Sequence, residues 1–320
     1  MNKYYSNGKL LLTGEYVVLD GAKSLAVPTK FGQDLVIEPI QESELIWGSF
    51  TNEGECWFEA IFDLPKLRLK NATFNSSKEG SAEFIAETLQ TILKEARSLN
   101  PDFLQSDSGF IVKTNLSFPR NWGLGSSSTL INNIASWAKV DGYALLWNAF
   151  SGSGYDIACA QNNKPIFYQL DVIERSKNQQ PVVNLVDFNP SFSDELFFVH
   201  LNKKQNSRDG IQTYKEYQSK RSFDSAQDDI KEISNLSNEF VKANSISDLE
   251  KVIQEHENII ASIIKLQPVK KELFSDYFGA VKSLGAWGGD FVLVTGNKDT
   301  PNYFKQKGFG TVLSYKEMIL

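Results

Sequence analysis

Hydrophobic residues recur along the chain with two different periods, which predict strands in one set of segments and helices in another. Short apolar runs predict strands at residues 9–12, 16–19, 34–40, 55–62, 109–116, 165–170, 196–201 and 291–295. Apolar residues spaced three and four apart predict helices at residues 81–98, from 126 onward, and at 209–220, 247–265 and 269–284. The polar segment 222–229 is expected to be a flexible loop.

Capping and breaking residues divide these segments. Ser81 is suited to cap the helix that follows it. The pair Asn189-Pro190 breaks the chain before a new strand. Because 320 residues are enough for two domains with cores of their own, we expect one domain at residues 1–189 and a second at residues 190–320.

Composition narrows the class of protein. A hydrophobic content of 41% with 12% aromatic residues is typical of an ordinary globular protein. The formal net charge of −6 argues against a general nucleic-acid surface, so an anionic ligand would need a local cluster. Cys56 and Cys159 are far apart and lack the spacing of a zinc site or a disulfide framework. We find no membrane span or signal-peptide core and expect a cytoplasmic protein with no membrane or nucleic-acid partner.

The segment 119–129, PRNWGLGSSST, places glycines and hydroxyls immediately before an amphipathic helix. The first N–H groups of a helix have no partner within it, and the helix dipole adds positive charge there, so the segment favours a bound phosphate. Gly123 and Gly125 allow positive φ and a close backbone approach. A serine-capped helix after a loop is the simpler alternative for this pattern taken alone.

Near the start of the chain, residues 8–21 read GKLLLTGEYVVLDG. Lys9, in a short strand flanked by glycines, is suited to project its ammonium into a cleft, where it could bind phosphate or stabilise a developing alkoxide. A solvated lysine on an edge strand is the alternative.

Small residues precede a carboxylate in the segment 151–158, SGSGYDIA. The tight turn they allow leaves Asp156 at the entrance of an apolar segment, where it could act as a general base or orient a hydroxyl. An aspartate that caps a helix is an equally simple interpretation.

A third glycine-rich segment, LGAWGGD at residues 284–290, joins a predicted helix to a predicted strand. A helix C-cap and turn would account for one glycine. A close backbone approach to a ligand would account for the others.

In their order along the chain, the segments 8–21, 119–128 and 285–290 together resemble the three motifs of the GHMP kinases. Details of the first and third motifs and of the segment 152–158 resemble the isoprenoid branch of that family. The resemblance implies an α+β fold with two domains. The first would be a ribosomal-protein-like α/β domain, the second a ferredoxin-like domain, and the active site would lie between them.

The resemblance also implies roles for individual residues in an enzyme that uses ATP and Mg²⁺. Lys9 and Asp156 would be catalytic, and Ser127 would hold the metal. The cofactor-binding residues would be Gly123, Leu124, Gly125, Ser126, Ser127 and Ser128. The substrate-binding residues would be Glu15, Tyr16, Ser153, Ser207, Arg208, Gly285, Gly288 and Gly289.

The expected partner is a small-molecule acceptor, and a homodimer is compatible with the sequence. Phosphomevalonate is the leading acceptor and mevalonate the next, ahead of homoserine or a sugar. A decarboxylase that begins with phosphorylation and a ligand-binding protein without catalysis are the alternatives.

The chain departs from the family pattern at four positions. Asn121 and Trp122 stand where the central motif usually has glycine and a small residue, and Trp287 replaces a glycine of the third motif. Leu145 stands where mevalonate kinases have an acidic Mg²⁺ ligand, so the resemblance does not supply a second metal ligand.

Overall fold

The computed structural model describes residues 1–320 except 75–80, 107, 172–180, 204–206 and 221, and describes residues 207–209 and 223 by their backbone alone. The chain forms two compact units, each built from several segments. Unit 1 comprises Met1–Gly8, Phe31–Arg120 and Leu124–Gln161. Unit 2 comprises Lys9–Lys30, Asn121–Gly123 and Asn162–Leu320. The predicted domain boundary at residue 189 stays a prediction.

A mixed sheet of eight strands has the order β5-β4-β3-β6-β2-β7-β8, with β1 paired to β2. Its strands are β1 Asn2–Leu11, β2 Ser24–Ile40, β3 Glu44–Phe50, β4 Cys56–Asp63, β5 Leu69–Phe74, β6 Gly109–Leu116, β7 Ile166–Gln169 and β8 Val182–Leu185. Strands β3 and β6 run parallel, whereas the other registered pairs are antiparallel. Burial alternates residue by residue along β3, because successive side chains of a strand point to opposite faces.

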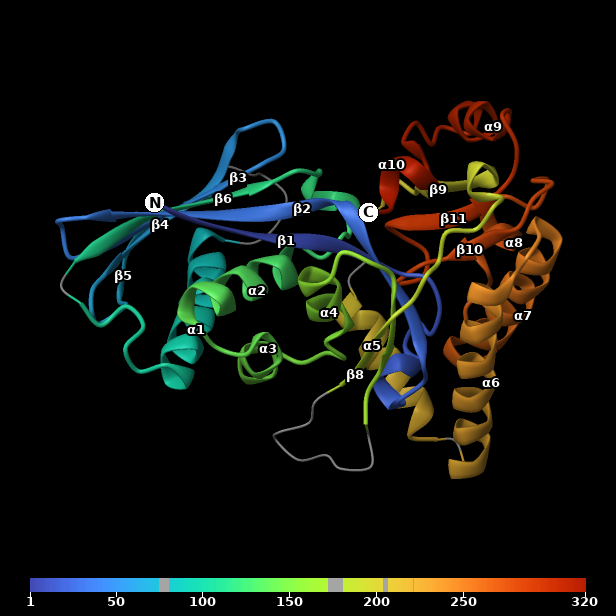
Figure 1. Cartoon of the computed structure of the whole chain (residues 1–320), viewed down its shortest axis with the longest axis horizontal. Coiled ribbons are helices and arrows are strands. Elements are labelled where there is room, and N and C mark those ends of the chain that lie inside the picture. The colour runs from blue at the N-terminus through green and yellow to red at the C-terminus, as the bar shows by residue number, and fades with distance from the viewer. Residues whose placement is uncertain (75–80, 107, 172–180, 204–206, 221) are drawn as a thin grey trace. The chain divides into compact units, whose positions relative to one another are not determined.

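Helices α1 Ala82–Leu99, α2 Ser126–Ala138, α3 Gly142–Ala149 and α4 Tyr155–Gln161 belong to unit 1. Helices α1, α2 and α3 contact one another on one side of the sheet (Figure 1). The Ser81 hydroxyl accepts a hydrogen bond from the Phe84 N–H, which confirms the predicted cap. The apolar stripe of α1 faces the interior through Ala86, Leu89, Ile92, Leu93 and Ala96.

Unit 2 contains an antiparallel sheet in the order β10-β11-β9-β12. The strands are β9 Leu196–His200, β10 Val281–Ser283, β11 Phe291–Thr295 and β12 Val312–Ser314. The helices are α5 Ser207–Gln218, α6 Phe223–Lys242, α7 Ile246–Ile264, α8 Val269–Leu273, α9 Thr300–Gln306 and α10 Tyr315–Met318. Helix α7 packs against α6 and β10 (Figure 1). Part of the core here is aromatic, with the buried side chains of Phe274 and Phe304 in edge-to-face contact.

The fold is α+β, as expected, and strands 109–116 and 291–295 have their predicted bounds. The predicted strand 16–19 is wrong. This segment is instead the 3₁₀ helix η1 Val17–Asp20, because Tyr16 has a φ of 65° and Gly21 closes the turn with a φ of 90°. Short 3₁₀ helices η2 Arg120–Trp122 and η3 Ser193–Glu195 also occur.

Two other predictions in unit 2 are wrong. The predicted loop 222–229 is the start of α6, where the Ser222 hydroxyl caps the helix by accepting from the Ser225 N–H. The predicted helix 269–284 divides into α8 and β10, because the chain leaves the helix at Phe274 and pairs Val281 with Val294. The elements that were not predicted are strands β3, β5, β8 and β12 and helices α3, α4, α9 and α10.

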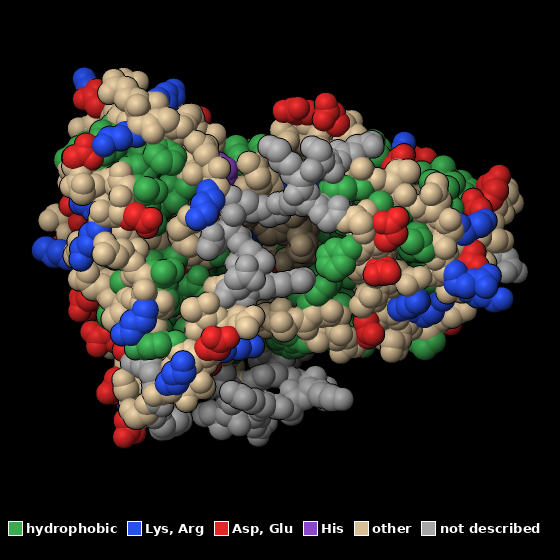
Figure 2. All heavy atoms as spheres, turned by 180° about the vertical axis from the view of Figure 1, so that it is seen from behind, with side chains coloured by type: hydrophobic (Ala, Val, Ile, Leu, Met, Phe, Trp, Pro, Cys, Tyr) green, Lys and Arg blue, Asp and Glu red, His purple; other side chains and the backbone are tan. Residues whose placement is uncertain are grey.

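Over the described ranges, no helix is both long and apolar enough to cross a membrane. On the face drawn in Figure 2, acidic and basic side chains are interspersed.

Candidate functional site

Within unit 2, the structure brings together residues of all three glycine-containing motifs. Lys9 lies in β1, and its Nζ donates a hydrogen bond to the Gly123 carbonyl over 3.1 Å. These residues are 114 apart in sequence. The predicted catalytic ammonium therefore contacts the loop that is predicted to bind phosphate.

Gly123 also contacts the end of the third motif. Its φ is 67°, and a Cβ at this position would lie 2.2 Å from Cγ and 2.3 Å from Oδ2 of Asp290. Asp290 has a φ of 53°, its N–H donates to the Lys203 carbonyl over 2.7 Å, and its carbonyl accepts from Leu201 over 2.8 Å. Both the conformation and the available space at residue 123 therefore require glycine.

His200, at the end of β9, holds the start of the same loop. Its Nδ1 accepts from the Asn202 N–H over 3.3 Å, which assigns the proton to Nε2, and Nε2 then donates to the Asn121 carbonyl over 3.1 Å. The Trp122 ring packs edge-on against Phe291 with ring centroids 5.4 Å apart. The sequence analysis missed His200, although a lone polar residue in the apolar run 196–201 was a signal for it.

In unit 1, the loop enters α2 through Gly125, which has a φ of 88° and makes no side-chain capping hydrogen bond. Ser127 is exposed in the first turn, whereas Leu124 is buried. Because Gly125 provides no side chain to cap the first N–H groups, the geometry suits an anion that accepts from them.

Asp156 lies in the first turn of α4, and the Ser128 hydroxyl donates a hydrogen bond to its Oδ2. The Ser128 side chain is only 6% exposed, so this bond fixes the carboxylate relative to α2. The nearby Ser153 is also buried. Of the three predicted serines, Ser128 is engaged by the carboxylate and Ser127 faces solvent, which favours Ser127 as the ligand-facing hydroxyl.

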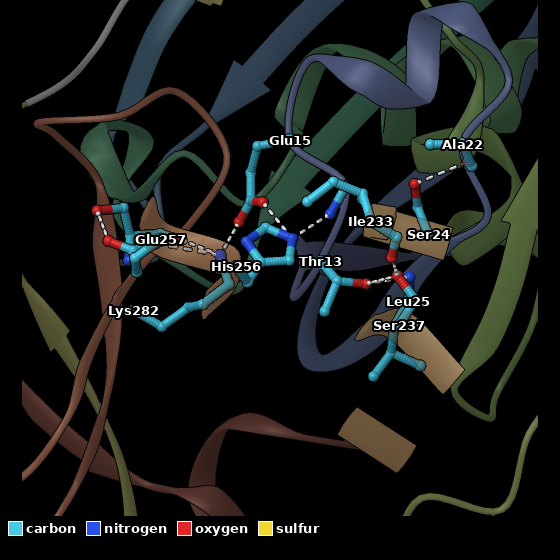
Figure 3. Close-up of polar contacts among 12 residues, drawn as sticks. Thr13, Glu15, Ala22, Ser24, Leu25, Ile233, Ser237, His256, Glu257 and Lys282 are labelled. Atoms are coloured by element: carbon cyan, nitrogen blue, oxygen red, sulfur yellow. Dashed lines mark hydrogen bonds and ion pairs between the residues drawn. The ribbon is translucent and has the colours of Figure 1, made fainter. Parts of the chain in front are cut away.

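Glu15 of the first motif lies in a fully buried cluster with Lys282, Glu257 and His256 (Figure 3). Lys282 Nζ donates to Glu15 Oε1 over 2.6 Å and to the Ser283 carbonyl over 2.9 Å, and it lies 3.4 Å from Glu257 Oε1. Glu257 accepts from the Ser283 N–H and hydroxyl. One ammonium thus serves two buried carboxylates.

His256 contributes to this cluster as a neutral ring. Its Nε2 accepts from the Gly14 N–H over 2.9 Å. Burial, and secondly the Lys282 charge, lower its pKa well below the ordinary value. Although Nε2 also lies 3.5 Å from Glu15 Oε2, the two groups do not form an ion pair, because the same nitrogen lone pair accepts from Gly14.

Burial also raises the pKa values of the two carboxyls. It raises the pKa of Glu257 to about 7, an effect that Glu15 reinforces and Lys282 opposes. Burial raises the pKa of Glu15 as well, again against the charge of Lys282. Since the two carboxyls share one lysine, the cluster retains a proton more readily than exposed carboxyls do.

The neighbouring Tyr16 contacts the third motif directly. Its hydroxyl accepts a hydrogen bond from the backbone N–H of Trp287 over 3.4 Å, and its ring stacks on Tyr214 with ring centroids 5.8 Å apart. Trp287 is 2% exposed, and its indole N–H has no hydrogen-bond partner among the described residues. Gly285 and Gly288, on either side of Trp287, have φ values of 58° and 84°.

Three other predicted site residues lie in the third motif and at the start of α5. Gly289 is buried in the third motif. Ser207 and Arg208 form the start of α5, but their side chains lie outside the described residues. Among the described residues, no group of three His, Cys, Asp or Glu side chains could hold a metal ion.

No protein-family model matches this sequence, and no curated protein matches it either. Solved structures do match its fold. Mevalonate kinase from Methanococcus jannaschii aligns with a TM-score of 0.66 and 16% identity over 96% of this chain and 94% of that one. Phosphomevalonate kinase from Streptococcus pneumoniae, in complex with phosphomevalonate and AMPPNP, aligns with a TM-score of 0.64 and 16% identity over 96% of each chain.

Galactokinase from Lactococcus lactis, complexed with galactose, aligns with a TM-score of 0.64 and 12% identity over 95% of this chain and 88% of that one. The chain therefore shares the fold of these three kinases. Identities of this size show a shared fold.

Replacing Gly123 tests the close approach to Asp290. Gly123→Ala should lower the free energy of unfolding by the cost of positive φ, about 1–2 kcal/mol, plus a steric cost of roughly 1–3 kcal/mol. Gly308→Ala is a matched control, because Gly308 has a φ of 91° and would place its Cβ in open space. Urea denaturation should give the larger loss for Gly123→Ala, and adding Asp290→Gly should recover part of it. Equal losses in the two alanine variants would show that Asp290 exerts no constraint.

The Glu257 carboxyl should make stability depend on pH. Its pKa is about 7 in the folded protein against an ordinary 4.5, so the folded state retains a proton that the unfolded chain releases between these values. The resulting stabilisation is present below pH 4.5 and is lost as the pH rises to about 7. Relative to Glu257→Gln, the parent should therefore lose about 2 kcal/mol between roughly pH 5 and pH 8.

Denaturant midpoints of the two proteins at both pH values would measure this difference. The neutral His256 acts in the opposite direction, since its lowered pKa costs stability as the pH falls. It is present in both proteins, so it largely cancels in the comparison. Parallel pH profiles for parent and variant would contradict the assignment.

Proposed function

We propose that this chain is an ATP-dependent kinase that phosphorylates a small-molecule acceptor. The observation that carries this proposal is the meeting of the three motifs at Gly123, which Lys9 contacts from the first motif and Asp290 contacts from the third. Its fold, shared with mevalonate kinase, phosphomevalonate kinase and galactokinase, supports the same reaction class.

The residues of the loop that precedes α2 fit the phosphates of a nucleoside triphosphate. Gly125 leaves the start of α2 without a side-chain cap, and the exposed Ser127 offers a hydroxyl beside those N–H groups. Bound Mg²⁺ would neutralise phosphate charge, and we assign Ser127 as its protein ligand.

Asp156 would accept the proton of the acceptor hydroxyl as that oxygen bonds to the γ-phosphorus of ATP and ADP leaves. The hydrogen bond from Ser128 holds the carboxylate in one orientation for this task. Lys9 would stabilise the negative charge that develops on the transferring group. No covalent intermediate with the protein is required.

Phosphomevalonate is the acceptor that we place first, with mevalonate second. The third motif, which ends in Asp290, supports this order, because its pattern resembles that of phosphomevalonate kinases. Tyr16 and the start of α5 would contribute to acceptor binding. If kcat/KM is higher for mevalonate than for phosphomevalonate, the order is reversed. A homodimer and a cytoplasmic location also stay predictions, which sedimentation and cell fractionation would test.

Asp156→Asn tests the proposed base. Asparagine preserves the shape of the side chain but cannot accept a proton in this way, so kcat should fall by roughly 10²-fold or more while nucleotide affinity changes little. Asp141→Asn is the control, because Asp141 caps α3 in the same unit and asparagine preserves that cap. An ADP-release assay that finds the two variants equally active would remove Asp156 from the mechanism.

Ser127→Ala tests the proposed metal ligand. Loss of the hydroxyl should raise the Mg²⁺ concentration needed for half-maximal turnover by about tenfold, the cost of one hydrogen bond or ligand of about 1.4 kcal/mol. Ser136→Ala is the matched control, since Ser136 lies later in α2 and donates to the Asn132 carbonyl. An Mg²⁺ titration that is unchanged by Ser127→Ala excludes Ser127 from the metal site.

A further inference from the structure

The buried lysine of unit 2 joins two of the three motifs. Lys282 lies in β10, three residues before Gly285, whereas Glu15 follows Gly14 in the first motif. Their side chains meet at 2.6 Å across 267 residues of sequence, and neither is exposed to solvent. The ammonium of Lys282 also reaches the Ser283 carbonyl and the Glu257 carboxylate, so its donors have acceptors.

Stability alone does not explain this arrangement. Removing an ammonium and two carboxylates from water costs several kcal/mol per ion, and buried ion pairs can often be replaced by apolar residues without loss of stability. An ion pair does specify geometry, because each charge has few alternative partners once it is buried. A role other than stabilisation is therefore needed to explain the cluster. Because the cluster lies beside two of the motifs, we look for that role in the geometry of those motifs.

The third motif is attached to the first motif at two points. Lys282 is bound to Glu15, and the backbone N–H of Trp287 donates to the hydroxyl of Tyr16, the residue that follows Glu15. Between these attachments lies Gly285, which has a φ of 58° and where an added Cβ would meet open space. A glycine-containing segment is free to adopt many conformations, so attachment on both sides of it restricts the loop where its own sequence does not.

The first motif is itself anchored to two helices. The Thr13 hydroxyl is 2.6 Å from the Ser237 hydroxyl of α6, and the Gly14 N–H donates to His256 of α7. Glu15 then binds Lys282, so three consecutive residues are each held by a partner of unit 2 (Figure 3). These contacts fix the first motif against α6 and α7. The glycine loop is attached to the first motif, so the same two helices also determine its position.

We propose that Lys282 and Glu15 are positioning residues, whose buried ion pair fixes the glycine-rich loop 285–290 against the first motif in the geometry that phosphoryl transfer requires. This role rests on the kinase function proposed above. Neither side chain needs to touch the substrates for the pair to act. Displacing a loop by about 1 Å is enough to lower a transfer rate by roughly 10²-fold.

Two substitutions break the pair, and two others serve as comparisons. Lys282→Met and Glu15→Ala remove the contact, whereas Glu15→Gln keeps an oxygen that can accept from Lys282. Glu257→Gln removes a charge from the same cluster but leaves the Glu15–Lys282 pair in place. Tyr277→Phe is a stability control, because it deletes a buried hydroxyl of unit 2 that donates to the Thr295 carbonyl.

We expect Lys282→Met and Glu15→Ala to lower kcat by roughly 10²-fold, with Glu15→Gln recovering most of that loss. The kcat of Glu257→Gln and of Tyr277→Phe should stay within about threefold of the parent value, although Tyr277→Phe should lower the free energy of unfolding. The double variant Glu15→Ala/Lys282→Met should be no slower than either single variant, because both remove the same contact. If Lys282→Met does not fold, Lys282→Met/Glu15→Gln, which carries one buried carboxylate fewer, replaces it.

A second readout does not depend on activity. Trp287 lies inside the proposed loop and is 2% exposed, so its fluorescence should shift to the red when the loop loosens. The chain has six tryptophans, and subtracting the spectrum of the matching Trp287→Phe protein isolates this one. The shift should occur in Lys282→Met and Glu15→Ala and be absent in Glu257→Gln and Tyr277→Phe.

The two readouts separate this inference from the proposed function. If the parent transfers no phosphate, the kinase proposal fails, and the Trp287 spectrum alone decides whether the pair holds the loop. If Lys282→Met and Glu15→Ala keep the parent kcat, or leave the Trp287 emission unchanged, the pair is not a positioning device. If Tyr277→Phe loses as much kcat as Lys282→Met and Glu15→Ala do, the positioning role is also overturned, because general destabilisation would then be enough to explain the loss.

Discussion

One buried ammonium constrains much of unit 2. Lys282 has no access to water, so its charge must be balanced by groups of the protein, and Glu15, Glu257 and the Ser283 carbonyl provide that balance. This requirement fixes where β10 lies relative to the first motif and to α7. The glycine loop that follows β10 starts from the position so defined.

Steric exclusion supplies the second constraint. A residue with a Cβ at position 123 would overlap the Asp290 carboxylate, so the central loop can lie against the third motif only because it has glycine there. The hydrogen bond from Lys9 of β1 and the one from His200 of β9 then hold the loop at two further points. Charge, sterics and hydrogen bonding thus converge on the same three segments.

Sequence reasoning identified the features of the site that are local in the chain. The start of α2 could be predicted because Gly125 and three serines precede an amphipathic run, and the cap by Ser81 follows from the same logic. Strand β6 could be predicted because its apolar run has clear ends. Each of these three predictions depends on residues that are a few positions apart in the sequence.

Contacts between distant segments could not be predicted in this way. Glu15 was expected to bind substrate, and the sequence offers no indication that its partner is Lys282, a residue that the apolar period placed in a helix. The Ser128 hydroxyl was assigned to a nucleotide but donates to Asp156, 28 residues later. Tyr16 was expected in a strand, yet its positive φ starts a 3₁₀ helix, because tertiary contacts at Trp287 and Tyr214 outweigh local preference.

The most direct test of the kinase assignment is to incubate the protein with ATP and Mg²⁺ and with phosphomevalonate, mevalonate, diphosphomevalonate, homoserine or galactose in turn. ADP release and product mass would be measured together. The account predicts that at least one acceptor, with phosphomevalonate first, gains a single phosphoryl group in step with ADP formation. ADP formation without any phosphorylated acceptor, or no turnover of ATP with the whole panel, would contradict it.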